Sequence, residues 1–287
     1  MTAAAFGYFA PSTVREALAL LAEHEQARPL AGGQSLVPMM IARLARPAVL
    51  VDLNRIPELT HITEADGELR IGSMVRQARL LASSHVAELV PLLSETLENV
   101  GHPPTRNRGT IGGSLANADP AAELPAAMLA LDAVMVLHGL RGERTVPAAD
   151  FFLGMFETAL AEGELLTEIR IPSGVRGGSS FLEITRRKGD FAIVSVAARL
   201  WNDRGRPDAR VVVGGIAPAP LRLSAVEEIV TGRGAGDSAI AEAVAAIPGD
   251  IVEFESHGAG RHYRGKVLRV LVRRALEAAR ARSETSP

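Results

Sequence analysis

Hydrophobic positions recur at helical spacing in a few stretches of this chain, and short apolar runs separate them. Val14, Leu18 and Leu21 lie on one face of a predicted helix. Thr13 and Glu16 form a capping box at its start. The same periodicity predicts further helices over residues 75–81 and 86–100, and apolar runs predict strands over residues 49–53, 68–72, 133–137 and 164–171.

The pattern changes after a Gly- and Ser-rich stretch at residues 172–180, which we interpret as a linker. Three strands follow, predicted over residues 181–186, 192–201 and 210–216, and the turns between them suggest an antiparallel meander. Ser224 with Glu227 is read as a capping box and Asp237 as the cap of the next helix. An amphipathic helix over residues 267–282 ends the pattern. The sequence therefore predicts an α+β fold in three parts, residues 1–56, 57–173 and 179–283.

Composition narrows the classes of function. The 287 residues include 31 basic and 33 acidic side chains, so the chain as a whole has no attraction for nucleic acid. No cysteine is present, which excludes disulfides, thiolate nucleophiles, Cys zinc sites and an iron–sulfur cluster held by thiolates of this chain. Neither a signal peptide nor a membrane span is recognisable, and we expect a soluble cytoplasmic protein.

A glycine turn at residues 31–35 precedes the apolar run that begins at Leu36. Gly32 and Gly33 leave room for successive backbone N–H groups to converge on an anion, and the Ser35 hydroxyl adds a donor. A helix that begins at Leu36 would point its positive end at the same anion. Taken alone, these residues are also explained by a plain tight turn.

A second turn, about eighty residues later, carries Gly112 and Gly113. Short polar side chains accompany it at Thr110, Ser114 and Asn117, and Arg106 and Arg108 precede it. Asp119 before Pro120 is typical of a helix cap, with proline at the first helical position. Glu123, one turn later, suits either a hydrogen bond to a sugar or polyol hydroxyl or a solvated first-turn carboxylate.

The remaining motifs of the chain say less about its function. The chain has no G-x-G-x-x-G fingerprint, P-loop or G-x-S-x-G motif. His257 and His262 have poor spacing for a metal, and no metal site is expected. His102 lies beside the second glycine segment, where it could contact a ligand or brace a loop. Residues 186–191 form a charged turn that ends in Phe191, typical of a hairpin with solvated charges.

Together the two glycine segments resemble a known family. AGGQSLVPMM at residues 31–40 and GHPPTRNRGTIGGSLANADPAAELP at residues 101–125 are similar to the flavin-binding medium subunits of the molybdenum hydroxylases. These include carbon monoxide dehydrogenase medium subunits and the FAD domain of xanthine dehydrogenase. RRKGDFAIVSVAARL at residues 186–200 and Tyr263 with Arg264 resemble parts of that family's C-terminal domain. The resemblance covers essentially the whole chain in the expected order.

The resemblance implies non-covalent FAD in a two-subdomain fold like that of the vanillyl-alcohol oxidase flavoproteins, followed by a small α+β domain. Glu123 takes the place of an acidic flavin ligand, and Phe191 stands where relatives carry a tyrosine beside the isoalloxazine. Ser114 departs from the usual Asn, and Leu182 stands where the xanthine dehydrogenase branch has a Lys ligand. The implied cofactor-binding residues are Ala31, Gly32, Gly33, Gln34, Ser35, Leu36, Val37, Pro38, His102, Thr110, Ile111, Gly112, Gly113, Ser114, Asn117, Glu123, Leu166 and Phe191.

The implied function is electron transfer within a larger oxidoreductase. A small subunit with [2Fe-2S] clusters would reduce the FAD, a large subunit with a molybdenum cofactor would oxidise the substrate, and a quinone, NAD⁺ or O₂ would accept the electrons. We expect a dimer of heterotrimers, with no catalytic acid or base in this chain. Two alternatives stay open: a stand-alone flavin reductase of the same fold, and a non-catalytic nucleotide-binding protein.

Overall fold

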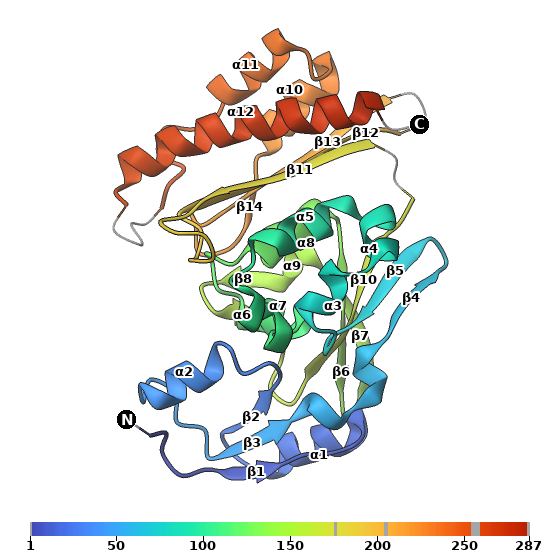
Figure 1. Ribbon diagram of the computed structural model, residues 1–287, viewed down its shortest axis with the longest axis vertical. Coiled ribbons are helices and arrows are strands. Elements are labelled where there is room, and N and C mark those ends of the chain that lie inside the picture. The colour runs from blue at the N-terminus through green and yellow to red at the C-terminus, as the bar shows by residue number, and fades with distance from the viewer. Residues whose placement is uncertain (1, 175–176, 204–205, 254–258, 286–287) are drawn as a thin grey trace.

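Three β-sheets stacked along the long axis form the framework of the molecule (Figure 1). The computed structural model describes residues 2–174, 177–203, 206–253 and 259–285. From the N-terminal end upward the strand orders are β1-β3-β2, β4-β5-β10-β6-β7 and β11-β12-β13-β14, and β8 and β9 pair separately. Helices fill the space between the upper two sheets and cover the last sheet from outside.

The first sheet is parallel, with β3 between β1 and β2. The capping box before its first helix is confirmed: Thr13 Oγ1 accepts from the Glu16 N–H, and the Glu16 carboxylate accepts from the Ser12 N–H. Val14 and Leu18 face the core as their spacing predicts. The elements are β1 Gly7–Phe9, α1 Val14–Glu23, β2 Ala27–Leu30, α2 Leu36–Ile41 and β3 Val49–Asp52, followed by the 3₁₀ helices η1 Leu53–Arg55 and η2 Pro57–Thr60.

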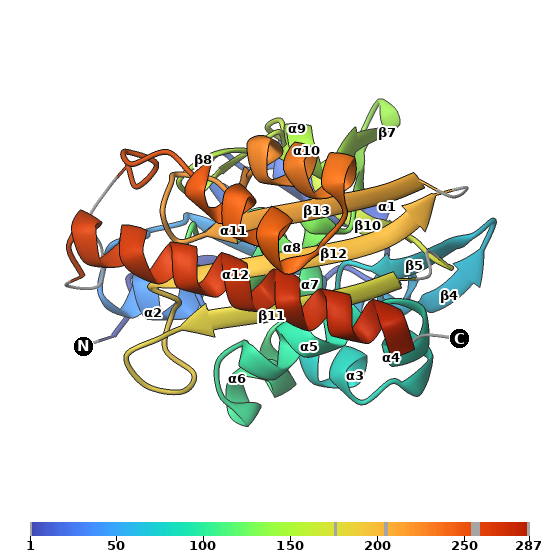
Figure 2. The same ribbon diagram turned by 90° about the horizontal axis from the view of Figure 1, so that it is seen from above.

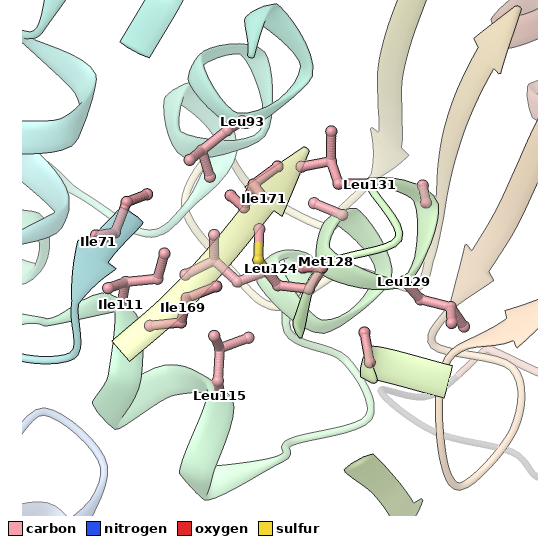
Figure 3. Close-up of a cluster of buried hydrophobic side chains, with 14 of the residues drawn as sticks. Ile71, Leu93, Ile111, Leu115, Leu124, Met128, Leu129, Leu131, Ile169 and Ile171 are labelled. Atoms are coloured by element: carbon pink, nitrogen blue, oxygen red, sulfur yellow. The ribbon is translucent and has the colours of Figure 1, made fainter. Parts of the chain in front are cut away.

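The middle sheet is antiparallel throughout, and its helices enclose the largest core. Its strands are β4 Ile62–Ala65, β5 Glu68–Gly72, β6 Val134–Gly139, β7 Gly142–Pro147 and β10 Leu165–Pro172, and a hairpin of β8 Phe152–Gly154 and β9 Glu157–Thr158 lies beside them. Its helices are α3 Gln77–Leu81, α4 Ser84–Leu89, α5 Pro91–Asn99, α6 Pro103–Arg108, α7 Ile111–Asn117, α8 Glu123–Ala130 and α9 Ala148–Phe151. Figure 3 shows Ile111 and Leu115 of α7 in this core with Leu124 of α8 and Ile169 of β10.

One expectation for this region was wrong. The helix predicted over residues 86–100 is divided into α4 and α5, because Pro91 cannot donate a backbone hydrogen bond and so begins a new helix. The glycine- and proline-rich segment at residues 101–120 contains two short helices, α6 and α7. Pro103 begins α6, and Thr110 caps α7.

The antiparallel meander predicted for the last part of the chain is confirmed. Side chains along β12 alternate between two cores: Val194, Val196 and Ala198 pack under the outer helices, whereas Ala197 packs on the middle core. Figure 2 shows α10, α11 and α12 covering the outer face. The elements are β11 Gly177–Ile184, β12 Val194–Asp203, β13 Arg206–Gly214, β14 Leu221–Arg222, α10 Ser224–Arg233, α11 Asp237–Ala245 and α12 Arg261–Thr285.

Local details of this part differ from the expectation. The linker predicted at residues 172–180 is mostly strand, because β10 runs to Pro172 and β11 begins at Gly177. Ser224 begins α10 without capping it, since the buried Glu227 carboxylate accepts from the Val211 N–H instead. The carboxylate of Asp237 pairs with Arg280 of α12 at 2.7 Å, so Asp237 does not cap α11. None of the described helices is both long and apolar enough to cross a membrane.

The first prediction concerns a substitution at Gly178, because α12 packs directly on β11 at this residue. A Cβ at this position would overlap the backbone of Ala279 and lie 2.5 Å from the Ser283 nitrogen. We expect Gly178→Ala to lower the free energy of unfolding by about 1–3 kcal/mol, measured by thermal unfolding followed by circular dichroism. Gly232 of α10 is the matched control, since a Cβ there meets nothing within 4 Å. Gly232→Ala should raise stability by up to about 1 kcal/mol, and the reverse order of the two variants would contradict the packing.

Candidate functional site

The first glycine turn, residues 31–35, leaves a run of backbone N–H groups unpaired. Gly33 has φ +72°, a conformation that favours glycine, and this bends the chain between β2 and α2. Among the described residues, no protein group accepts a hydrogen bond from the backbone N–H of any of the five residues from Gly32 to Leu36. Successive free N–H groups in a tight turn are a binding site for an anion.

The second turn offers no comparable run of free N–H groups. It is the first turn of α7, and its N–H groups are engaged within the chain. The Ile111 N–H donates to Val75 O, the Gly112 N–H to Ser73 O at 2.8 Å, and the Gly113 N–H to Thr110 Oγ1 at 3.0 Å. The start of α7 is therefore capped by Thr110 and by the segment after β5.

The glycines of the two turns instead allow a direct contact between the turns. A Cβ on Gly32 would overlap the Arg108 carbonyl and lie 2.8 Å from the Cα of Gly109. A Cβ on Gly113 would lie 3.1 Å from the Cβ of Ala31. Segments about eighty residues apart in sequence thus form one surface, with the free N–H groups of the first turn on it.

A polar clamp that sequence reasoning missed fixes this contact. The Arg76 guanidinium donates to Arg108 O and, at 2.5 Å, to Asn54 Oδ1. The Asn54 amide donates in turn to Ala31 O at 3.0 Å. Arg76 and Asn54 belong to no motif in the sequence, and only the fold places them between the turns.

A pocket of about 520 Å³ lies beside the second turn, within the usual range for a ligand site. Phe191 is half exposed, and Ser114 links the pocket to the second turn. His102 packs against the loop that carries Phe191, because a Cβ on Gly189 would lie 2.6 Å from His102 Cε1. The lining residues are Val100, Gly101, Ser114, Ala122, Glu123, Arg186, Gly189, Asp190 and Phe191.

Glu123, the first residue of α8, is buried with 4% of its surface exposed, so the alternative of a solvated carboxylate is wrong. Burial raises the pKa of Glu123 to about 7, and the nearby Asp119 contributes. The Asp119 carboxylate accepts from the Ala121 N–H at 2.9 Å and closes a turn before α8, so it does not cap the helix. Glu183 on β11 was not singled out in the sequence, yet burial and the charge of Glu123 raise its pKa to about 8.

Hydrogen bonds from the last helix, α12, fix the end of the loop that carries Phe191. Arg264 of α12 is fully buried, and its guanidinium donates to Ile193 O at 2.8 and 3.1 Å. The Ile193 N–H in turn donates to Ile184 O at 2.7 Å. Arg264, which with Tyr263 carries part of the resemblance in the C-terminal domain, therefore fixes the loop that lines the pocket.

Several other predicted residues do not line the pocket. Leu166 of β10 is buried in the middle core with 5% of its surface exposed, and it does not line the pocket. The Ile111 side chain is likewise in that core, so only its backbone belongs to the turn. Asn117 ends α7, and Leu36, Val37 and Pro38 open α2. The described residues contain no group of three His, Asp or Glu side chains that could hold a metal, and His257 lies outside them.

Comparison with known proteins identifies the class. Residues 4–174 match the family model of the FAD binding domain in molybdopterin dehydrogenase, and residues 179–279 match that of the CO dehydrogenase flavoprotein C-terminal domain. The chain therefore belongs to the family of FAD-binding medium subunits of carbon monoxide dehydrogenase and related molybdenum hydroxylases.

Individual relatives cover the chain almost completely. It is 40% identical to the 6-hydroxypseudooxynicotine dehydrogenase complex subunit alpha of Paenarthrobacter nicotinovorans, over 94% of this chain and 93% of the relative. It is 38% identical to the carbon monoxide dehydrogenase medium chain of Afipia carboxidovorans, over 99% and 100%. A solved structure of carbon monoxide dehydrogenase from Hydrogenophaga pseudoflava superposes with a TM-score of 0.94 at 39% identity, covering 99% of this chain and 100% of that one.

A substitution at Gly32 tests the contact between the two glycine turns. We expect Gly32→Ala to push the first turn away from Arg108 and to weaken FAD binding at least tenfold, about 1.4 kcal/mol. The measurement is the dissociation constant from flavin fluorescence. Gly249→Ala is the control, because a Cβ on Gly249 meets nothing within 4 Å. Equal affinity in the two variants would refute a binding role for the contact.

The stability of the FAD-free chain should fall as pH rises from about 4.5 to about 7. The pKa of Glu123 is about 7 when folded, against a reference value of 4.5. Between these values the folded state holds a proton that the unfolded state has lost, so increasing pH favours unfolding by up to about 3 kcal/mol. Urea unfolding at several pH values measures the slope. Glu123→Gln should flatten it between about pH 4.5 and 7, and an unchanged slope would show that Glu123 titrates normally.

Proposed function

We infer that this chain binds FAD without a covalent bond and serves as the electron-transfer subunit of a molybdenum-containing dehydrogenase. The observation that carries this proposal is the contact between two glycine turns, one of which offers consecutive free N–H groups. A pyrophosphate needs such donors and close approach of the backbone. Because members of the family are FAD subunits, we propose that the anion at the first turn is the pyrophosphate of FAD.

The residues present fit this cofactor. The first turn would hold the pyrophosphate, and the second would let the backbone approach it closely, because Gly113 packs on Ala31 without a side chain. The adjoining pocket, with Phe191 at one side and Glu123 in its wall, would take a further part of the cofactor. FAD supplies the redox chemistry when bound, and this chain binds, orients and shields it. We propose the same eighteen cofactor-binding residues as the sequence analysis, and the boundaries 1–56, 57–173 and 179–283.

The electrons must come from another chain. No cysteine is present to hold an iron–sulfur cluster, so a partner with such clusters is proposed to reduce the FAD. A second partner would carry the molybdenum cofactor, and relatives named as medium subunits support an assembly of this kind. We propose a dimer of heterotrimers in the cytoplasm, with a quinone, NAD⁺ or O₂ as electron acceptor.

The substrate of the complex is proposed to be chosen by the molybdenum partner. Relatives similar over most of this chain are named for chemically unrelated compounds, including glyceraldehyde, caffeine and carbon monoxide. One flavin-binding scaffold thus accompanies very different substrates. This supports a role for the chain in electron transfer rather than in substrate recognition.

The absorbance spectrum of the purified chain tests the proposal. We expect flavin bands, either as isolated or after reconstitution with FAD, and bleaching of those bands by a reduced iron–sulfur partner together with substrate. A chain that binds no FAD would rule the proposal out. Turnover of a small substrate by the isolated chain would favour a stand-alone reductase. Binding of a nucleotide without reduction by any partner would favour a non-catalytic protein.

A further inference from the structure

Arg76, in the segment between β5 and α3, places a positive charge at the contact between the two glycine turns. Its guanidinium donates to Arg108 O, the same atom that a Cβ on Gly32 would overlap. The carbonyl of Arg108 therefore contacts both the Arg76 guanidinium and the first turn. Among the described residues, no carboxylate lies within ion-pair distance of Arg76 or Arg108. The positive charge beside the turn is thus left without an acidic partner.

The acidic residue near this contact, Asp52 at the end of β3, is engaged by other groups. Its carboxylate accepts from the Tyr8 hydroxyl at 2.5 Å and from the Asn54 N–H at 2.9 Å. These bonds fix Asn54 with its Oδ1 toward Arg76, at 2.5 Å from the guanidinium, and its Nδ2 toward Ala31 O, at 3.0 Å. Because an amide accepts at one end and donates at the other, Arg76 determines which end of Asn54 faces the first turn.

Asn54 in turn determines where the first free N–H of the turn points. The C=O and N–H of a trans peptide point in opposite directions. Since the Ala31 carbonyl is directed at Asn54, the N–H of Gly32 is directed away from it. The Gly32 carbonyl accepts from Gln34 Nε2 at 3.3 Å, which has the same effect on the N–H of Gly33. Two consecutive donors are therefore oriented by side chains on the opposite side of their peptides.

We propose that Arg76 makes the first turn selective for the pyrophosphate of FAD, by holding Asn54 in the orientation that presents the Gly32 N–H and by adding its own charge beside that donor. This inference rests on the proposed function and deepens it. Attraction between opposite charges is stronger at a half-buried site than in water. The pyrophosphate benefits from both effects, whereas the flavin ring uses neither. Arg76 is a positioning residue, because it acts through Asn54 and through its charge.

Arg79 provides a matched comparison within α3, three residues further along the chain. Its guanidinium donates to Thr60 O at 2.6 Å, so it also ties a side chain of this region to a distant backbone carbonyl. None of the hydrogen bonds of the described residues joins Arg79 to either glycine turn. Arg79→Gln therefore removes a cation and a brace of the same kind without touching the proposed selectivity.

The experiment measures dissociation constants of the full chain for FAD and for riboflavin, which lacks phosphate, by flavin fluorescence. We expect Arg76→Gln to weaken FAD binding at least about tenfold and riboflavin binding less than about twofold. Arg79→Gln should change neither constant by more than about twofold. Equal losses for the two flavins in Arg76→Gln would show a merely structural role, and an unchanged FAD constant would also overturn the inference.

Two further variants separate the charge from the orientation of the donor. Arg76→Lys keeps the charge but loses the planar fork that spans Arg108 O and Asn54 Oδ1. We expect it, like Asn54→Ala, to bind FAD more weakly than the wild type while keeping the wild-type dependence on salt between about 0.05 and 0.5 M. Arg76→Gln should show a weaker salt dependence. The same salt dependence in Arg76→Gln and in the wild type would contradict the inference, and Arg76→Lys carries the test if Arg76→Gln does not fold.

Inorganic pyrophosphate separates this inference from the proposed function. Titrated into the FAD-free chain and followed by calorimetry, it should bind the wild type at least about fivefold more tightly than Arg76→Gln. If pyrophosphate binds in this way but FAD does not, the proposed function fails and the selectivity of the turn stands. If FAD binds the wild type and Arg76→Gln equally well, the inference fails and the proposed function stands.

Discussion

Two turns in backbone contact, with no side chain between them, determine how this chain builds its site. A Cβ at Gly32 would overlap the Arg108 carbonyl and push the first sheet away from the middle one, and a Cβ at Gly113 would crowd Ala31 and Thr110. Arg76 and Asn54 hold that contact by hydrogen bonds to the backbone on both sides. The apolar cluster under the first sheet also includes Met74 and Leu165 of the middle part, so apolar packing and the close fit of the turns together join the two subdomains into one surface.

The C-terminal sheet completes the same surface from the other side. Its strands alternate between two cores, so the sheet packs on α8 and is covered by α12 at the same time. This double burial turns one face of β11 toward α8 and positions the loop that carries Phe191.

Sequence patterns predicted the parts of this molecule whose determinants are local. The capping box at Thr13 and the antiparallel meander follow from residue type and spacing. Errors occurred where a tertiary contact or a proline overrides the pattern: Pro91 divides a helix, and Glu227 binds Val211 instead of capping α10. Arg76 and Asn54 could not have been found, because each acquires its role only from a segment that is distant in sequence.

The anchor at Arg264 has a consequence for biosynthesis. The Phe191 loop rests on a guanidinium contributed by the last helix of the described chain. A nascent polypeptide would expose both glycine turns long before α12 leaves the ribosome. The pocket would therefore be complete only after α12 has been synthesised and has packed on β11.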